Sequence, residues 1–93
     1  MSTDADFAGR SFHFIAIGGA GMSALALVCH RRGAAVTGSD RAESSYLERL
    51  RAAGIEPRIG HDAEQVPEDA EVVVSSAIPE TNPELAVARR RSR

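Results

Sequence analysis

A glycine-rich turn between two apolar runs is the stretch of this sequence best suited to chemistry. Residues 18–23 read Gly-Gly-Ala-Gly-Met-Ser, and the spacing from Gly19 to Ala24 fits the pattern G-x-G-x-x-G/A. In that pattern the first glycine permits a sharp turn, the second leaves room for a ligand, and the last small residue lets the helix pack on the strand. The first N–H groups of the following helix lack intrahelical partners and lie at the positive end of its dipole. The turn therefore predicts an anion site, and a pyrophosphate is its usual guest.

Two further stretches are candidates for the same site. Asp40 follows Gly21 by 19 residues, close to the spacing of about 20 at which dinucleotide-binding proteins place an acid for ribose hydroxyls. Residues 75–78 follow the apolar run 72–74 and would form the opposite lip of the site. The predicted ligand contacts are Gly18, Gly19, Ala20, Gly21, Met22, Ser23, Asp40, Ser75, Ser76, Ala77 and Ile78.

Apolar runs and turn residues predict strands that alternate with helices. We expect strands at 12–17, 35–40, 55–60 and 72–74, and helices at about 22–32, 45–53 and 83–91. Strands joined by helices form right-handed crossovers and a parallel sheet, here in the expected order 3-2-1-4. The third strand contains a proline and should lie at an edge. The predicted fold is α/β, one small Rossmann-like domain of three layers with its site at the switch point.

Local signals define the helices in more detail. Leu25, Val28 and Cys29 are expected to form the buried stripe of the first helix. Ser45 and Glu48 have the S-x-x-E spacing of a capping box at the start of the second. The remaining end signals are Gly33 and Gly54 as stops and the pair Asn82-Pro83 as a start.

Length and composition limit the classes of function. The 93 residues suffice for one small domain, and we expect a flexible leader at 1–11 and the domain at 12–93. A net charge of −2, with three Phe, one Tyr and no Trp, gives neither a basic surface nor a stacking platform for nucleic acid. No apolar run approaches the ~20 residues that span a bilayer. The single cysteine, Cys29, excludes an internal disulfide and fits a reducing cytosol.

Four segments together resemble the amino-terminal domain of the Mur ligases. The family's opening motif is close to H-F-I-G-I-G-G-x-G-M-S, and residues 13–23 read His-Phe-Ile-Ala-Ile-Gly-Gly-Ala-Gly-Met-Ser. Ala16 replaces the usual glycine, and we expect it to lie inside the first strand. The resemblance extends from about residue 12 to 91. Its later matches are Gly38-Ser39-Asp40, Gly60-His61 and the run 74–79 (Val-Ser-Ser-Ala-Ile-Pro) followed by Asn82-Pro83-Glu84.

The resemblance implies that the chain is the UDP-N-acetylmuramate-binding domain of a three-domain ligase. Such an enzyme uses ATP and Mg²⁺ to add L-alanine to that nucleotide sugar in peptidoglycan precursor synthesis, in the bacterial cytoplasm. Its central domain carries a G-x-x-G-K-[ST] loop, which is absent here because all eleven Lys+Arg residues are arginines. We therefore expect no cofactor, metal or catalytic residue in this piece. Its expected partners are UDP-N-acetylmuramate and the enzyme's own central and carboxyl-terminal domains, not nucleic acid or membrane.

The resemblance also gives roles to single residues. It places Asp40 near the nucleotide and gives His61 a contact to a phosphate or sugar oxygen. Residues 75–78 would contact uracil or the diphosphate, and Ile78 and Pro79 would form an apolar wall for the uracil ring. His13 and His30 are expected to be structural.

Two other classes of function stay open at this point. The bare glycine pattern with Asp40 also permits the NAD-binding domain of an oxidoreductase. A nucleotide-sensing module without chemistry would show the same turn. Affinity for UDP-N-acetylmuramate against NAD separates the ligase from the oxidoreductase.

Overall fold

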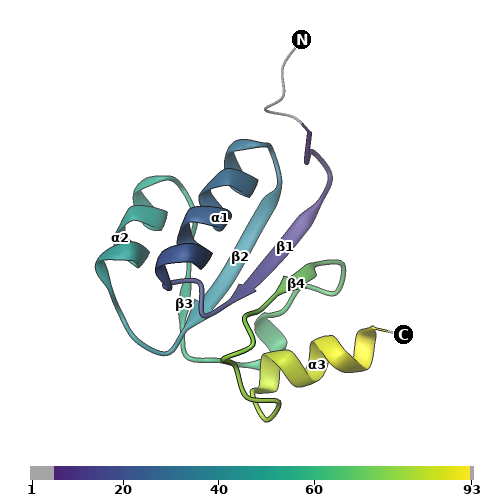
Figure 1. Cartoon of the computed structure of the whole chain (residues 1–93). Helices are drawn as coiled ribbons and strands as arrows, with labels where there is room; N and C mark the ends of the chain where they lie inside the picture. Colours follow the sequence, from purple (N-terminus) through teal and green to yellow (C-terminus); the bar gives the residue numbers. More distant parts are fainter. Residues whose placement is uncertain (1–5, 93) are drawn as a thin grey trace.

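The computed structural model describes residues 6–92 and contains one four-stranded sheet. All three strand pairs are parallel, in the order β3-β2-β1-β4 (Figure 1). The predicted α/β class, parallel sheet, strand order and edge position of the third strand are confirmed. The elements are β1 (Ser11–Ile15), α1 (Ala20–Arg31), β2 (Ala35–Asp40), α2 (Ser45–Ala52), β3 (Arg58–Ile59), the 3-10 turn η1 (Ala63–Gln65), β4 (Glu71–Val73) and α3 (Pro83–Arg91).

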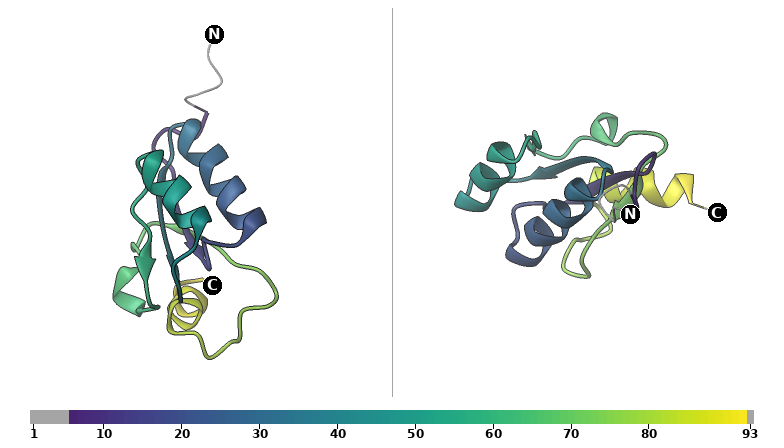
Figure 2. Two further views of the ribbon diagram at one scale, coloured as in Figure 1. Left: turned by 90° about the vertical axis from the view of Figure 1, so that its left-hand side faces the viewer. Right: turned by 90° about the horizontal axis from the view of Figure 1, so that it is seen from above.

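Segments on both faces of the sheet make three layers. The helices α1 and α2 lie side by side on one face (Figures 1 and 2). The turn η1 and the first residues of α3 lie together on the other face, where Glu84 contacts side chains of both β1 and η1. The sheet is therefore covered on each side by different segments.

The alternation of side chains along β1 divides the two faces. Phe12 and Phe14 belong to the apolar core beneath α1 and α2, together with Leu47 and Leu50. His13, between them, is 1% exposed and points to the opposite face, where its ring contacts Glu84. Successive residues of a strand face opposite sides. The buried histidine of β1 is thus placed on the second face.

The buried stripe of α1 differs from the predicted one. Leu25 and Val28 are 45% and 43% exposed, whereas Ala26 and Cys29 are buried. The helix also begins two residues before the expected start at 22, and Ala24 is exposed rather than packed on the strand. Apolar residues occupy most positions of α1, so its sequence does not show which side faces the core.

The cap of α2 lies one residue earlier than predicted. The helix does begin at Ser45, but Ser44 is the N-cap, and its hydroxyl accepts a hydrogen bond from the N–H of Leu47. Ser45 and Glu48 therefore form no capping box. Adjacent serines give nearly equal signals, so the sequence alone does not show which of them caps the helix. Gly33 and Gly54 have φ of 98° and 103° and follow the two helices as predicted.

Ala16 lies in a turn and not inside the first strand, which ends at Ile15. Its φ is 67°, in the left-handed region that L-residues other than glycine rarely adopt. Pairing with β2 resumes at Ile17, whose N–H donates to the Ser39 carbonyl over 2.9 Å. The expectation that Ala16 is a strand residue is wrong, and the turn geometry explains why glycine suits this position.

The amino-terminal residues that the structure describes pack against the domain. The Phe7 N–H donates to the Arg32 carbonyl over 2.9 Å, and the Phe7 and Phe12 ring centroids lie 5.7 Å apart. This part of the expected flexible leader is therefore a folded turn, and Ser11 already belongs to β1. Residues 1–5 of that leader lie outside the described residues. Within 6–92, none of the helices combines the length and apolar character needed to cross a membrane.

Candidate functional site

The glycine turn lies at the carboxyl edge of the sheet, between β1 and α1. Gly18 is held there by a hydrogen bond from its N–H to Asp40 Oδ2 over 2.8 Å. A Cβ on Gly18 would lie 2.8 Å from that oxygen and 3.2 Å from Ser44 Oγ. Only glycine fits here without displacing neighbours. Within the turn, Gly18 is thus a glycine whose neighbours leave no room for a Cβ.

Gly21 is in the opposite situation. A Cβ at this position would meet no atom within 4 Å, and its φ is not in the left-handed region. No contact with the described residues calls for glycine at position 21. The open space beside it is what a ligand close to the backbone would need.

The first turn of α1 offers backbone donors at this open space. Ser23 is the first residue of the helix whose N–H has a partner, the Gly19 carbonyl at 2.8 Å. In the described part of the chain, the N–H groups of Ala20, Gly21 and Met22 have no acceptor. Ser23 itself is buried, and its hydroxyl donates to the Ala20 carbonyl over 3.1 Å. Its side chain therefore closes the turn, and the donors that can reach an anion are backbone groups.

Asp40 joins two parts of the carboxyl edge. Its Oδ2 accepts from Gly18, while its carbonyl accepts from the N–H of Gly60 over 2.7 Å. Its other carboxylate oxygen lies 3.4 Å from the N–H of Ala42. The structure therefore gives Asp40 a bracing role, and a ligand contact by this residue stays a prediction.

The remaining predicted residues also lie at this edge. Residues 75–78 follow β4 in a turn in which the Ile78 N–H donates to the Ser75 carbonyl over 3.2 Å. Ser75, Ser76 and Ala77 are exposed and Ile78 is partly buried. His61 follows Gly60, whose φ of 95° reverses the chain after β3. Because all strands are parallel, these segments share an edge with the glycine turn.

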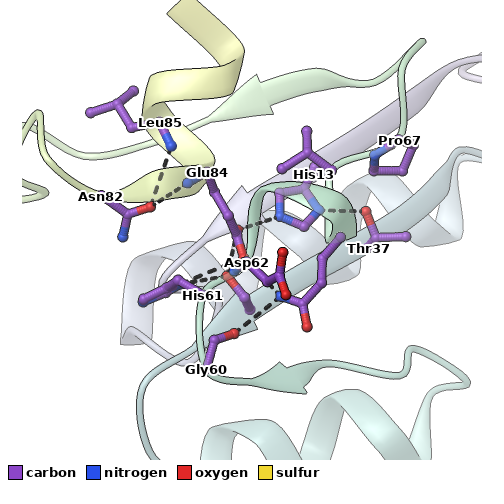
Figure 3. A network of polar contacts seen from close by, with 12 residues as sticks. His13, Thr37, Gly60, His61, Asp62, Pro67, Asn82, Glu84 and Leu85 are labelled. Atoms are coloured by element: carbon purple, nitrogen blue, oxygen red, sulfur yellow. Dashed lines mark hydrogen bonds and ion pairs between the residues drawn. The ribbon is translucent and has the colours of Figure 1, made fainter.

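Behind the edge, a buried network of side chains centres on Glu84 of α3 (Figure 3). Glu84 is fully buried, and His13 Nε2 and Ser39 Oγ each lie 2.6 Å from its Oε1. The Asp62 N–H and Gln65 Nε2 donate to Oε2 over 3.0 and 2.8 Å. Four donors thus fill the lone-pair positions of the carboxylate. No side-chain N or O atom buried in the described residues lacks a partner.

The pKa of Glu84 reflects two opposed effects. Burial acts to raise it, but hydrogen bonds from His13, Ser39 and the Asp62 backbone outweigh burial and lower the pKa to about 2. The carboxylate is therefore ionised at neutral pH. An ionised carboxylate only accepts hydrogen bonds, so all four partners act as donors toward it.

Little in the sequence indicates this network. The structural role predicted for His13 is confirmed, but its partner Glu84 lies 71 residues away and stood out only as the end of Asn82-Pro83-Glu84. That segment is the predicted helix start, since Asn82 Oδ1 accepts from the N–H groups of Glu84 and Leu85. The available signal was polar residues on alternate positions, at 13 in β1 and at 37 and 39 in β2.

Two features of phosphate and metal sites were not found in the described residues. The chain has no lysine for a phosphate loop, and residues 6–92 contain no group of three or more His, Cys, Asp or Glu suited to a metal. A cavity of about 380 Å³ lies between β4 and α3, lined among others by Glu71, Leu85 and Arg89. Its lining includes none of the predicted site residues. The candidate site is thus the exposed carboxyl edge.

The chain is similar in sequence and in fold to known ligases. The chain is 60% identical over 80 residues to the UDP-N-acetylmuramate–L-alanine ligase of Rubrobacter xylanophilus, covering 86% of the chain and 18% of that protein. It is 57% identical over 84 residues to the same-named ligase of Symbiobacterium thermophilum, covering 88% and 17%. The crystal structure of the UDP-N-acetylmuramate–alanine ligase of Thermotoga maritima matches with a TM-score of 0.80 at 36% identity, over 87% of the chain and 19% of that structure.

The chain therefore spans about a fifth of the length of these relatives. The family model described as "Mur ligase family, catalytic domain" matches residues 11–92, which is nearly the whole chain. With a fold, a glycine turn and relatives that all agree, the chain belongs to the Mur ligase family.

Proposed function

We propose that this chain is the UDP-N-acetylmuramate-binding domain of an ATP-dependent ligase that joins L-alanine to that nucleotide sugar. The observation that carries the proposal is the open first turn of α1, in a chain 60% identical to a ligase of that name. In this proposal the N–H groups of Ala20, Gly21 and Met22 bind the diphosphate. Residues 75–78 and His61 lie beside the uridine part.

In this proposal, the steps of the ligase reaction are divided among the domains of the enzyme. Activation of the sugar-linked carboxylate as an acyl phosphate needs a lysine loop and Mg²⁺. These would come from another domain of the enzyme, and a third domain would help bind the amino acid. This chain's own residues bind and orient the nucleotide and perform no bond-forming step. The same proposal places the reaction in the bacterial cytoplasm.

A substitution at Gly21 tests the site with little risk to the fold. Because a Cβ there meets no atom within 4 Å, Gly21→Val should fold normally while its side chain enters the space next to the donors. We expect calorimetric titration with UDP-N-acetylmuramate to show a loss of affinity of at least tenfold, equivalent to about 1.4 kcal/mol. Ala52→Val, at the exposed end of α2, is the matched control and should bind like the unchanged chain. A folded Gly21→Val variant with unchanged affinity contradicts the proposal.

The NAD-binding alternative is not favoured, because the relatives named above are all ligases. The same titration decides it directly. We expect heat from UDP-N-acetylmuramate and none from NAD under the same conditions. Tighter binding of NAD would reverse the assignment.

A further inference from the structure

The hydroxyl of Ser39 links His61 to the buried carboxylate of Glu84, and His61 Nδ1 also lies 3.8 Å from Glu84 Oε2. Ser39 Oγ lies 2.8 Å from His61 Nδ1 and 2.6 Å from Glu84 Oε1. Ser39 is fully buried, whereas the His61 side chain is 19% exposed. Within residues 6–92, the other ring nitrogen of His61, Nε2, has no hydrogen-bond partner. Nδ1 of the ring thus contacts a buried side chain, and Nε2 is free to contact a ligand.

The direction of these hydrogen bonds follows from counting hydrogens. A serine hydroxyl has one hydrogen to donate, and an ionised carboxylate can only accept. Ser39 must therefore donate to Glu84, which leaves its lone pairs facing His61 Nδ1. For that 2.8 Å contact to be a hydrogen bond, Nδ1 must carry the hydrogen. In a neutral imidazole the second nitrogen, Nε2, then has a free lone pair.

Glu84 also holds the backbone on which His61 is carried. Its Oε2 accepts from the N–H of Asp62, the next residue, over 3.0 Å. The same oxygen accepts from Gln65 Nε2, which also donates to the Gly60 carbonyl over 3.1 Å. The chain is therefore held on both sides of His61, and Figure 3 shows these segments converging on one carboxylate.

We propose that Glu84 and Ser39 are positioning residues that hold neutral His61 as its Nδ1–H tautomer, with Nε2 presented as a hydrogen-bond acceptor to the bound nucleotide. The ligand part of this proposal rests on the proposed function. A phosphate oxygen also accepts and so does not pair with Nε2. The partner is an N–H or O–H group of the uridine, such as the uracil imide or a ribose hydroxyl. Of the two contacts expected for His61 from the sequence, a phosphate or a sugar oxygen, this proposal keeps the sugar oxygen and removes the phosphate.

The first test needs no ligand. Long-range proton–nitrogen NMR spectra of the histidine rings distinguish a protonated from an unprotonated ring nitrogen. At a pH where His61 is neutral, we expect a protonated Nδ1 and an unprotonated Nε2. The reverse pattern in the free chain overturns the proposal, whatever the chain binds.

The second test compares two hydroxyls on the same face of β2. Ser39→Ala removes the link to His61, so the fixed Nδ1–H pattern should give way to a mixture of tautomers. Thr37→Val is the matched control, because Thr37 Oγ1 contacts His13 Nδ1 at 2.7 Å and is not bonded to His61. We expect UDP affinity to fall about threefold to tenfold in Ser39→Ala, as for one hydrogen bond, and by less than about twofold in Thr37→Val. Equal effects of the two variants, or an unchanged His61 tautomer in Ser39→Ala, would mean that Ser39 is only structural.

Addition of UDP to the unchanged chain separates this proposal from the proposed function. We expect the His61 Nε2 resonance to move while that nitrogen stays unprotonated, as for an acceptor. A Nε2 that gains a proton on binding indicates a phosphate contact and overturns the proposal. If UDP moves no resonance, the proposed function fails, and the tautomer in the free chain still decides the roles of Ser39 and Glu84.

Discussion

The two faces of the sheet are stabilised in different ways, although the same strands supply both. Beneath α1 and α2, apolar side chains such as Phe14, Leu47 and Leu50 are fully buried. On the other face, the centre is the charged Glu84, which is equally buried and held by four donors. Apolar contacts are non-directional, whereas a carboxylate needs each partner in place. One face tolerates adjustment, and the other requires a fixed geometry.

The fixed face is also the one that borders the candidate site. His61 and the segment from Gly60 to Gln65 belong to the Glu84 network, and Ser39 precedes Asp40, which braces the glycine turn. A site that binds by hydrogen bonds gains from groups held in one geometry before the ligand arrives. The apolar face supports the strands, and the polar face sets the orientation of the residues at their ends.

Removal of Glu84 should have the largest effect. In Glu84→Ala, His13, Ser39, Gln65 and the Asp62 N–H lose their common acceptor inside the protein. We expect the free energy of unfolding, measured by urea denaturation at pH 7, to fall by about 3–5 kcal/mol. The matched truncation on the apolar face is Leu50→Ala, with an expected loss of about 2–5 kcal/mol. A loss below about 1 kcal/mol for Glu84→Ala would show that the network is dispensable.

The pH dependence should separate the two faces more sharply. The pKa of Glu84 is lowered from 4.5 to about 2 in the folded chain, so its ionisation stabilises the fold fully above pH 4.5 and progressively less between 4.5 and 2. We expect this group alone to reduce the free energy of unfolding by about 1 kcal/mol between pH 7 and pH 3.5. The loss of unfolding free energy caused by Leu50→Ala should be the same at pH 7 and at pH 3.5.

The comparison for this pH prediction is a variant that folds without the charge. Glu84→Gln keeps the size of the side chain and removes its titration. Its unfolding free energy should depend less on pH between 4.5 and 2 than that of the unchanged chain. Identical pH profiles for the two proteins would assign the acid sensitivity to other carboxylates.

The apolar face could be largely predicted from sequence and the polar face could not. Apolar strands and helix stops such as Gly33 are local signals, and they sufficed for the strand order and fold class. The contact between His13 and Glu84 joins residues 71 apart, and no local pattern encodes it. The prediction of the buried side of α1 was wrong for another reason. Apolar residues occupy most positions around this helix, so its sequence did not show whether Leu25 and Val28 face the core or the solvent.

At the site, the sequence indicated the turn and the edge but not the roles within them. Gly18 and Gly21 look alike as letters, yet one is required by Asp40 and the other by nothing in the described chain. Asp40 was expected to face a ligand, and the structure shows it bonded to the backbone of Gly18. Such roles depend on which atoms approach after folding. The motif therefore predicted where the site lies but not the role of each residue in it.

The smallest expected effect on the free energy of unfolding is at Ala16. This residue lies in the turn after β1 and belongs to neither face of the sheet. With φ of 67°, this residue is in a conformation that costs an L-residue about 1–2 kcal/mol, part of which glycine gives back through its more flexible unfolded state. We expect Ala16→Gly to raise the free energy of unfolding by about 0.5–1 kcal/mol, equally at pH 7 and pH 3.5. Ala24→Gly, on an exposed position inside α1, is the matched control and should lower it by about 1 kcal/mol. If both substitutions destabilise the chain, the turn at Ala16 is not strained, and its geometry does not explain why glycine suits this position.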